Sequence, residues 1–411
     1  MFYLKLPGLY PTLSVHATIQ AINMKQRNYG SFVYFLYMLV FQMHGVLILH
    51  AGSSGYHTDI HESLFQKTDF PSAKSCQACH PVHYEEWSVS AHAYAQLSPI
   101  TSAMQAKIMK LTNGTNGDFC IRCHSPAAMD AGEPVMLANE DRHELSREGV
   151  SCTACHRMEN APGKSSGRNA LKRGGIFEAV YGPGDGRSLE EVINGDEFKV
   201  NAKAGGSGRN IHREIRQMKQ MTTSSFCGSC HDVTHVNGFR LEEAFSEYKS
   251  SPAAKAGVSC QDCHMGKEPG KASGYSHLPA AIVGGKPTAE RKRTDHTFIG
   301  PDSSIVHPGI FPHNPDAGEL ATFDEWLEFR YREGWGTDEF EDNVRADYIF
   351  PSRWKKVSDR YEARTIIDKN IKLLDKAAAK RKQLLQVGYR LGEVEVERAD
   401  ARGIAFRVKV E

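Results

Sequence analysis

Ten cysteines and nineteen histidines are the residues of this 411-residue chain best suited to chemistry, because thiols and imidazoles bind metals. Every cysteine belongs to a Cys-X-X-Cys-His sequence. The five copies are Cys76-Gln-Ala-Cys79-His80, Cys120-Ile-Arg-Cys123-His124, Cys152-Thr-Ala-Cys155-His156, Cys227-Gly-Ser-Cys230-His231 and Cys260-Gln-Asp-Cys263-His264. This is the attachment signature of c-type haem. It predicts five haem c groups, each bound by two thioethers and ligated through iron by the adjacent, proximal histidine.

Three alternative roles fit the cysteines less well. A disulfide framework would not place a histidine after every second cysteine. Structural zinc sites take four ligands, and five identical units do not divide in that way. Thioredoxin-like motifs lie beside a βαβ pattern and occur singly. Haem is therefore the cofactor that the sequence predicts.

The second axial position of each iron separates the functional classes. A second histidine gives a closed, low-potential carrier, methionine raises the potential, and an open position can bind substrate. Because eleven further histidines are available for five irons, we expect mostly bis-histidine ligation. Met158 and Met265 follow proximal histidines too closely to reach the same irons. The candidates are His57, His61, His83, His92, His143, His212, His235, His277, His296, His307 and His313.

One segment resembles a known family. Trp87-Ser88-Val89-Ser90-Ala91-His92-Ala93 is similar to the W-x-x-(S/T)-A-H-A segment of the tetrahaem cytochrome c that accepts electrons from hydroxylamine oxidoreductase. Gly149-Val150-Ser151-Cys152 also resembles that family, and the likeness covers roughly residues 70–235. It implies that His92 ligates the haem of Cys152 and Cys155. It also implies that a histidine after the third motif, here His212, ligates the first haem, and that the haem of Cys120 and Cys123 has an open face.

The fifth motif lies outside the tetrahaem pattern. It resembles larger multihaem cytochromes in which an H-x-F-x-G segment follows, as Asp295-His296-Thr297-Phe298-Ile299-Gly300 does here. The resemblance places His296 on the fourth or fifth haem, with His277 as the second choice. Basic residues near the motifs are expected to pair with haem propionates; they are Arg122, Arg157, Lys172 and Arg173.

The haem-binding domain is predicted to span residues 56–315. The chain between Cys76 and His264 is too short to build a conventional core around each haem. We therefore expect a mainly α fold with much irregular structure, built round stacked haems. Helices are predicted over Tyr84–Leu97 and over Thr101–Leu111, the second ended by Gly114. The Gly/Lys-rich stretch from 267 to 293 is predicted to be an irregular loop.

The chain beyond the haem-binding domain changes character. Residues 316–388 form a predicted helical segment, helical near Phe323–Arg332 and again over Ser358–Val387, which ends at Gly388. The apolar stripe of this long helix is interpreted as a packing face; it contains Ile367, Ile371, Leu374, Ala378 and Leu385. Residues 389–411 alternate polar and apolar side chains around a turn at Asp400–Gly403. They predict a β-hairpin, interpreted as the start of a small, truncated β domain.

Residues 1–55 are interpreted as a mis-called extension followed by an export signal. From Met24 the sequence gives two basic residues, an apolar run over Phe32–Leu49 and a small-residue zone at Ala51. We predict that Met24 is the true start and that cleavage occurs near Ala51. An uncleaved membrane anchor is the alternative.

The charge balance removes any case for a nucleic-acid partner, because 50 Lys and Arg oppose 49 Asp and Glu. The sequence predicts a periplasmic or cell-surface pentahaem cytochrome that carries electrons in a respiratory chain. Its expected partners are a quinol-linked donor and a downstream reductase or external acceptor. One alternative is a multihaem oxidoreductase acting on a small nitrogen or sulfur compound at an open haem. The other is a self-associating subunit of a haem filament.

Overall fold

The structure, a computed structural model, describes residues 70–159, 169–235, 237–303, 307, 315–388, 390–401 and 403–410. The chain divides into the units 1–55 and 56–411, and every described residue belongs to the second. The predictions for the export signal, the start at Met24 and the candidate ligands His57, His61 and His313 lie outside the described residues. Within the described ranges, no helix is both long and apolar enough to span a bilayer.

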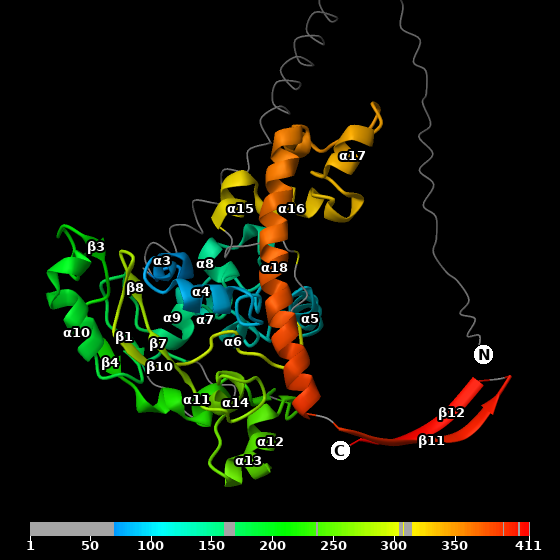
Figure 1. Ribbon diagram of the computed structural model, residues 1–411, viewed down its shortest axis with the longest axis horizontal. Coiled ribbons are helices and arrows are strands. Elements are labelled where there is room, and N and C mark those ends of the chain that lie inside the picture. Colours follow the sequence, from blue (N-terminus) through cyan, green and yellow to red (C-terminus); the bar gives the residue numbers. More distant parts are fainter. Residues whose placement is uncertain are drawn as a thin grey trace, which may run out of the picture. The chain divides into compact units, whose positions relative to one another are not determined.

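The haem-binding region consists of short helices joined by irregular chain (Figure 1). This agrees with the predicted fold class. The helices are α3 (Ala73–Gln77), α4 (Pro81–Ser88), α5 (Pro99–Leu111), α6 (Ile121–His124), α7 (Pro126–Ala131), α8 (Glu144–Arg147), α9 (Cys152–His156), α10 (Arg187–Asn194), α11 (Ser224–Gly228), α12 (Ala244–Ser250), α13 (Pro252–Lys255) and α14 (Cys260–His264). Single 3₁₀ turns are η1 (Asn139–Asp141), η2 (Asp196–Phe198) and η3 (Lys219–Thr222).

The helix predicted over Tyr84–Leu97 is wrong in both bounds. Helix α4 already begins at Pro81 and ends at Ser88, and turns occupy the following residues to Leu97. The carbonyl of His92 accepts the backbone N–H of Ala95 at 3.3 Å within a turn and that of the distant Val150 at 2.9 Å, so it takes no part in an α-helical hydrogen-bond ladder.

Helix α5 confirms the second predicted helix, although it begins earlier. Ser98 accepts a hydrogen bond from the N–H of Thr101 at 3.3 Å and so caps the helix before Pro99. Gly114, with φ of 82°, lies just beyond its end as predicted.

Strands in the described chain form small two-stranded sheets. The parallel pairs are β1 (Val180–Gly182) with β4 (Ile215–Gln217) and β2 (Val200–Asn201) with β3 (Arg209–Asn210). The antiparallel pairs are β5 (Val233–Thr234) with β6 (Arg240–Glu242), β7 (Ser276–Pro279) with β10 (Glu290–Arg293), β8 (Ile282–Val283) with β9 (Lys286–Pro287) and β11 (Leu391–Asp400) with β12 (Gly403–Val410).

The stretch from 267 to 293 is therefore not the predicted irregular loop. The pair β8–β9 is a tight hairpin nested inside the pair β7–β10. Gly284 and Gly285, with φ of 58° and 84°, form its two-residue turn. Only glycine adopts such angles readily, and they match the twist of the flanking strands.

The carboxy-terminal segment is helical, as predicted. It contains α15 (Pro315–Leu320), α16 (Phe323–Glu328), η4 (Tyr331–Glu333), α17 (Asp338–Asn343), η5 (Ser352–Trp354) and α18 (Val357–Gly388). Helix α18 matches the predicted long helix to within one residue at each end. Its stripe packs at Ile367, which is fully buried, whereas Leu385 near the end is 38 % exposed.

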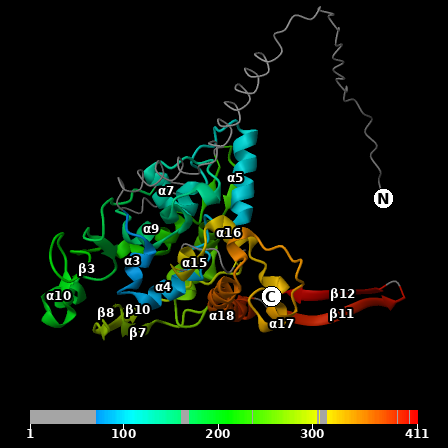
Figure 2. The ribbon, with the colours of Figure 1, turned by 90° about the horizontal axis from the view of Figure 1, so that it is seen from above.

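One hydrophobic cluster joins this segment to the chain on either side of the first motif. Trp87 and Tyr94 pack with Trp326, Trp354 and Ile367, all of them buried. Helix α15 lies beside α18 in both views (Figure 1, Figure 2). The long helix is thus part of the same packed body as the chain around the first motif.

The predicted hairpin is confirmed in strands β11 and β12. Val394 pairs with Val408 and Val396 with Phe406, so apolar side chains alternate with charged ones along both strands.

Candidate haem-binding centres

Each Cys-X-X-Cys-His sequence folds as one helical turn. The backbone N–H groups of His80, His124 and His231 donate to the carbonyl of the first cysteine of the same motif at 2.8, 3.2 and 2.9 Å. The third and fifth motifs form α9 and α14. A helical turn places residues three and four apart on one face, so both thiols and the following imidazole can reach one group. All ten cysteines are half-buried and free of disulfides.

The motifs lie close to one another at their cysteines. Helix α3, which carries Cys76, contacts α9 of the third motif, and Cys76 and Cys152 are close enough to shift each other's pKa. Cys123 of the second motif and Cys230 of the fourth are likewise close enough to shift each other's pKa.

The fourth motif also meets the fifth. Helix α11, which contains Cys227, contacts α14, which begins at Cys260. Cys155 of the third motif interacts electrostatically with Cys230 of the fourth. All five attachment turns therefore form one connected group.

The proximal imidazoles are oriented as metal ligands require. Nδ1 of His80 lies 2.7 Å from the carbonyl oxygen of Ala280, and Nδ1 of His124 lies 3.0 Å from that of Ala95. The corresponding distances are 2.8 Å from His156 to Tyr181 and 2.6 Å from His264 to Ile299. A carbonyl only accepts, so Nδ1 carries the proton and Nε2 keeps the lone pair that binds iron. The residues present therefore fit haem.

In the fourth motif a carboxylate, rather than a backbone carbonyl, lies beside Nδ1 of the proximal histidine. Nδ1 of His231 lies 3.7 Å from Oε1 of Glu242, which belongs to β6. This carboxylate raises the pKa of His231. The other oxygen of Glu242 is buried without a hydrogen-bond partner.

The ring of His92 lies near that of His231, with the ring centroids 6.1 Å apart. This separation would allow both imidazoles to hold one iron, because metal–nitrogen bonds of about 2.0–2.1 Å fit between them. The family resemblance implies that His92 serves the haem of Cys152 instead. The backbone carbonyl of His92 does accept the N–H of Val150, next to the third motif. The ring of His92, however, lies near the ring of His231 in the fourth motif.

The ring of His296 lies near that of His156. The centroids are 6.4 Å apart, with the ring planes 20° from parallel. Nδ1 of His296 lies 3.0 Å from the carbonyl oxygen of Thr294, which leaves Nε2 as the ligating atom. The structure thus brings His296 to the third motif, whereas the resemblance to larger multihaem cytochromes placed it on the fourth or fifth haem. Phe298 contacts both His296 and His92, at centroid distances of 5.4 and 4.6 Å.

Two of the candidate ligands in the described chain lie near the first motif: His83, whose ring centroid is 5.8 Å from that of His80, and the buried His212. Nδ1 of His212 is buried without a hydrogen-bond partner. Burial, followed by the charges of His80, Arg157 and His156, lowers its pKa to about 4. Arg157 is itself buried and carries an unpartnered Nη1 atom, which fits a role in binding a propionate.

Other predicted residues lie elsewhere. His277 is exposed on β7, opposite Lys292 of β10. Nδ1 of His143 accepts a hydrogen bond from Leu145 and caps α8. Both ring nitrogens of His235 lie within hydrogen-bond distance of asparagine oxygens, at 3.2 and 3.1 Å.

Two of the basic residues expected near propionates have partners on the protein. Arg122 pairs with Asp118 at 2.9 Å, and Arg173 pairs with Asp130 at 2.7 Å.

Sequence reasoning missed the side chains that hold the segment carrying His296. Glu86 on α4 and Lys380 on α18 bind this segment from two sides. Neither residue belongs to a motif. The only signal in the sequence was that both lie on predicted helices.

Comparison with known families adds independent support. Residues 75–157 match the family described as cytochrome c554 and c-prime. The curated proteins and the solved structures gave no match. The matched residues include the first three motifs and His92. Over this region the chain is similar to the cytochrome c554 and c-prime family, which supports a multihaem c-type cytochrome that binds haem covalently and takes part in electron transfer.

Proposed function

We propose that this protein is a pentahaem c-type cytochrome that moves electrons outside the cytoplasmic membrane. The observation that carries the proposal is the proximity of the five Cys-X-X-Cys-His turns, at Cys76–Cys152, Cys123–Cys230 and Cys227–Cys260, with Cys155 near Cys230. Haems attached to neighbouring turns lie close enough for electrons to pass between their edges. Bound haem c supplies the one-electron carrier.

The chain's own residues position and tune these carriers. The carbonyl partners of the proximal imidazoles fix each ring and raise its basicity as a ligand. We assign His92 as the second ligand opposite His231, His296 as the second ligand opposite His156, and His212 to the haem of Cys76 and Cys79. Histidine in both axial positions favours a closed iron that carries electrons without binding substrate.

The proposed location follows from the way in which haem c is attached. Covalent haem attachment takes place outside the cytoplasmic membrane, which agrees with the export signal proposed after Met24. A quinol-linked donor would supply electrons, and a downstream reductase or external acceptor would receive them.

Electron paramagnetic resonance of the oxidised protein tests this proposal. We expect low-spin signals from the haems of His80, His156 and His231. In separate assays, a quinol-linked donor should reduce the protein, and the protein should not turn over nitrite or hydroxylamine. A high-spin centre that binds and turns over either compound would contradict the proposal of an electron carrier and would support the multihaem oxidoreductase. A concentration-dependent increase in size on light scattering would support the filament subunit instead.

A further inference from the structure

We propose that Lys380 and Glu86 are positioning residues that hold His296 against the haem of Cys152 and Cys155. This inference rests on the proposed function, because it takes His296 as an axial ligand. It extends the haem centre to α18, which lies outside the residues matched by the family.

Glu86 holds the backbone of His296. Its Oε2 accepts the N–H of His296 at 3.0 Å. Both of its oxygens accept hydrogen bonds from Nη1 of Arg293 at 2.8 Å. The side chains of Glu86 and Arg293 are only 13 % and 11 % exposed, so water screens this pair poorly. His83, one turn before Glu86 on α4, also places its ring 4.8 Å from that of His296.

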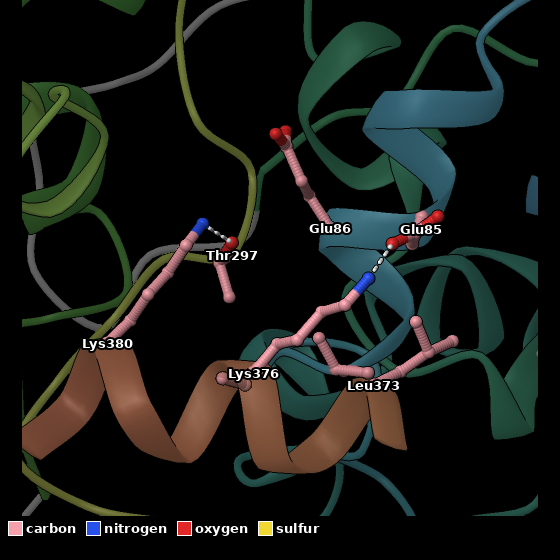
Figure 3. A pocket seen from close by; sticks show the side chains of 8 residues that line it. Glu85, Glu86, Thr297, Leu373, Lys376 and Lys380 are labelled. Atoms are coloured by element: carbon pink, nitrogen blue, oxygen red, sulfur yellow. Dashed lines mark hydrogen bonds and ion pairs between the residues drawn. The ribbon is translucent and has the colours of Figure 1, made fainter. Parts of the chain in front are cut away.

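Lys380 holds the residues on either side of His296. Its Nζ donates to the carboxylate of Asp295 and, at 2.9 Å, to Oγ1 of Thr297. Asp295 in turn accepts the backbone N–H of Thr297 at 2.8 Å. Figure 3 shows Lys380 reaching from α18 to Thr297.

These bonds matter because the segment has no regular secondary structure. Strand β10 ends at Arg293, and the described residues from 294 to 303 contain neither helix nor strand. A ligand on such a segment has no backbone ladder to fix it, so charge-assisted hydrogen bonds from neighbouring helices fix it instead. Glu86 and Lys380 reach the segment from two different helices, α4 and α18.

Lys376 provides a matched control on the same helix. It lies one turn before Lys380 and binds Glu85 at 3.3 Å (Figure 3). The two side chains are 69 % and 54 % exposed, and an exposed pair of this kind contributes little. Removing either lysine deletes one charge from the same helix, but only Lys380 touches the residues beside His296.

The test measures ligand exchange in the full haem-loaded protein. Cyanide displaces a histidine only as fast as that histidine leaves the iron, so each closed haem gives its own slow binding phase. In Lys380→Met we expect one slow phase to become ~10-fold faster, as the loss of a charge-assisted hydrogen bond predicts. Lys380→Arg and Lys376→Met should keep the wild-type rates. In a His296→Ala background, Lys380→Met should change no remaining phase.

The inference is overturned if Lys380→Met exchanges at the wild-type rate, or if Lys376→Met accelerates the same phase equally. A further change caused by Lys380→Met in the His296→Ala background would also overturn it, because Lys380 would then act elsewhere. A wild-type protein without haem overturns the proposed function and this inference together. A haem-loaded protein with an unchanged Lys380→Met variant overturns the inference alone.

Discussion

Nδ1 of His80, His156 and His264 lies 2.7, 2.8 and 2.6 Å from backbone carbonyl oxygens. In the folded protein these hydrogen bonds fix the tautomer and the ring direction of each imidazole. The carbonyls come from residues far along the chain, such as Ala280 and Ile299, so the motif alone does not reveal them. The sequence predicts which histidine ligates each iron, but the structure is needed to see what orients it.

Replacing His92 with Ala tests the distal assignment at one residue. Because its ring lies 6.1 Å from that of His231, we expect loss of the low-spin signal of one haem and the appearance of one high-spin signal. Electron paramagnetic resonance measures both. The exposed His277 is the control, and His277→Ala should retain the wild-type spectrum.

The same experiment separates two assignments of His92. If the affected haem is the one bound by Cys152 and Cys155, the pairing implied by the family resemblance is correct and the pairing with His231 is wrong. Preparing the variant in a background where His156 is replaced identifies which haem has changed.

Glu148 makes stability depend on pH. Its side chain is buried, accepting from Ser72 and from the N–H of Ala73 at 3.0 Å, and burial raises its pKa to about 7. Between its ordinary value of 4.5 and about 7, the folded state binds more protons than the unfolded state. The free energy of unfolding should therefore fall on the order of 3 kcal/mol as the pH rises through this window.

Denaturant unfolding at about pH 5 and about pH 8 measures this dependence. Glu148→Gln should reduce the difference between the two pH values, whereas the exposed Glu140→Gln should leave it unchanged. Equal pH dependence in wild type and Glu148→Gln would show that Glu148 does not titrate in this range.

The secondary-structure elements with a regular pattern of apolar residues were predictable. Helix α18 carries a regular apolar stripe ended by glycine, and β11 and β12 alternate around a turn. The absence of helix around His92 was not predictable, because its carbonyl accepts the N–H of Val150, which is distant in sequence. The nested hairpins after the fifth motif were missed because the Gly-rich composition concealed a Gly284-Gly285 turn.

Gly149, just before the third motif, packs closely against the backbone of His92. Its φ is +62°, and a Cβ there would lie 2.6 Å from the carbonyl oxygen of His92. Gly149→Ala should lower the free energy of unfolding by about 1–3 kcal/mol, because the backbone is in the left-handed region and the contact leaves no room. It should also disturb the ligation by His92.

Thermal or denaturant unfolding checks this prediction against Gly318→Ala. A Cβ at Gly318 in α15 meets nothing within 4 Å, and alanine favours a helix, so this control should be neutral or slightly stabilising. Equal stability of the two variants would mean that the approach of Gly149 to His92 is not required.

For the whole molecule, the packed apolar core is concentrated away from most motifs. The largest cluster surrounds Trp326, Trp335 and Trp354, includes Trp87 of α4 and packs against Cys152 of the third motif. Two much smaller clusters lie around Met158 and Leu189. The mainly α class was predictable from the spacing of the motifs. The distal pairings were not, because they depend on contacts such as His92 with His231 that only the folded chain creates.

Preventing haem attachment should unfold the region from 70 to 303. Its helices are mostly shorter than two turns, and such helices are unstable without packing partners. Folding should therefore be coupled to haem, as it is to metal in small metal-binding domains. Protein made without haem maturation should lose helical circular dichroism and be cleaved throughout this region by protease. A haem-free chain with the helix content and protease resistance of the loaded protein would show that the polypeptide folds unaided.

The pentahaem assignment requires that all ten cysteines bond five haems. The mass spectrum of the intact, denatured protein tests it most directly, because thioether-bound haem survives denaturation. We predict a mass above the bare polypeptide by five haems, with no free thiol and a Soret absorption band in the native sample. A spectrum at the bare polypeptide mass, or one with fewer haems and reactive thiols at any motif, would contradict the assignment.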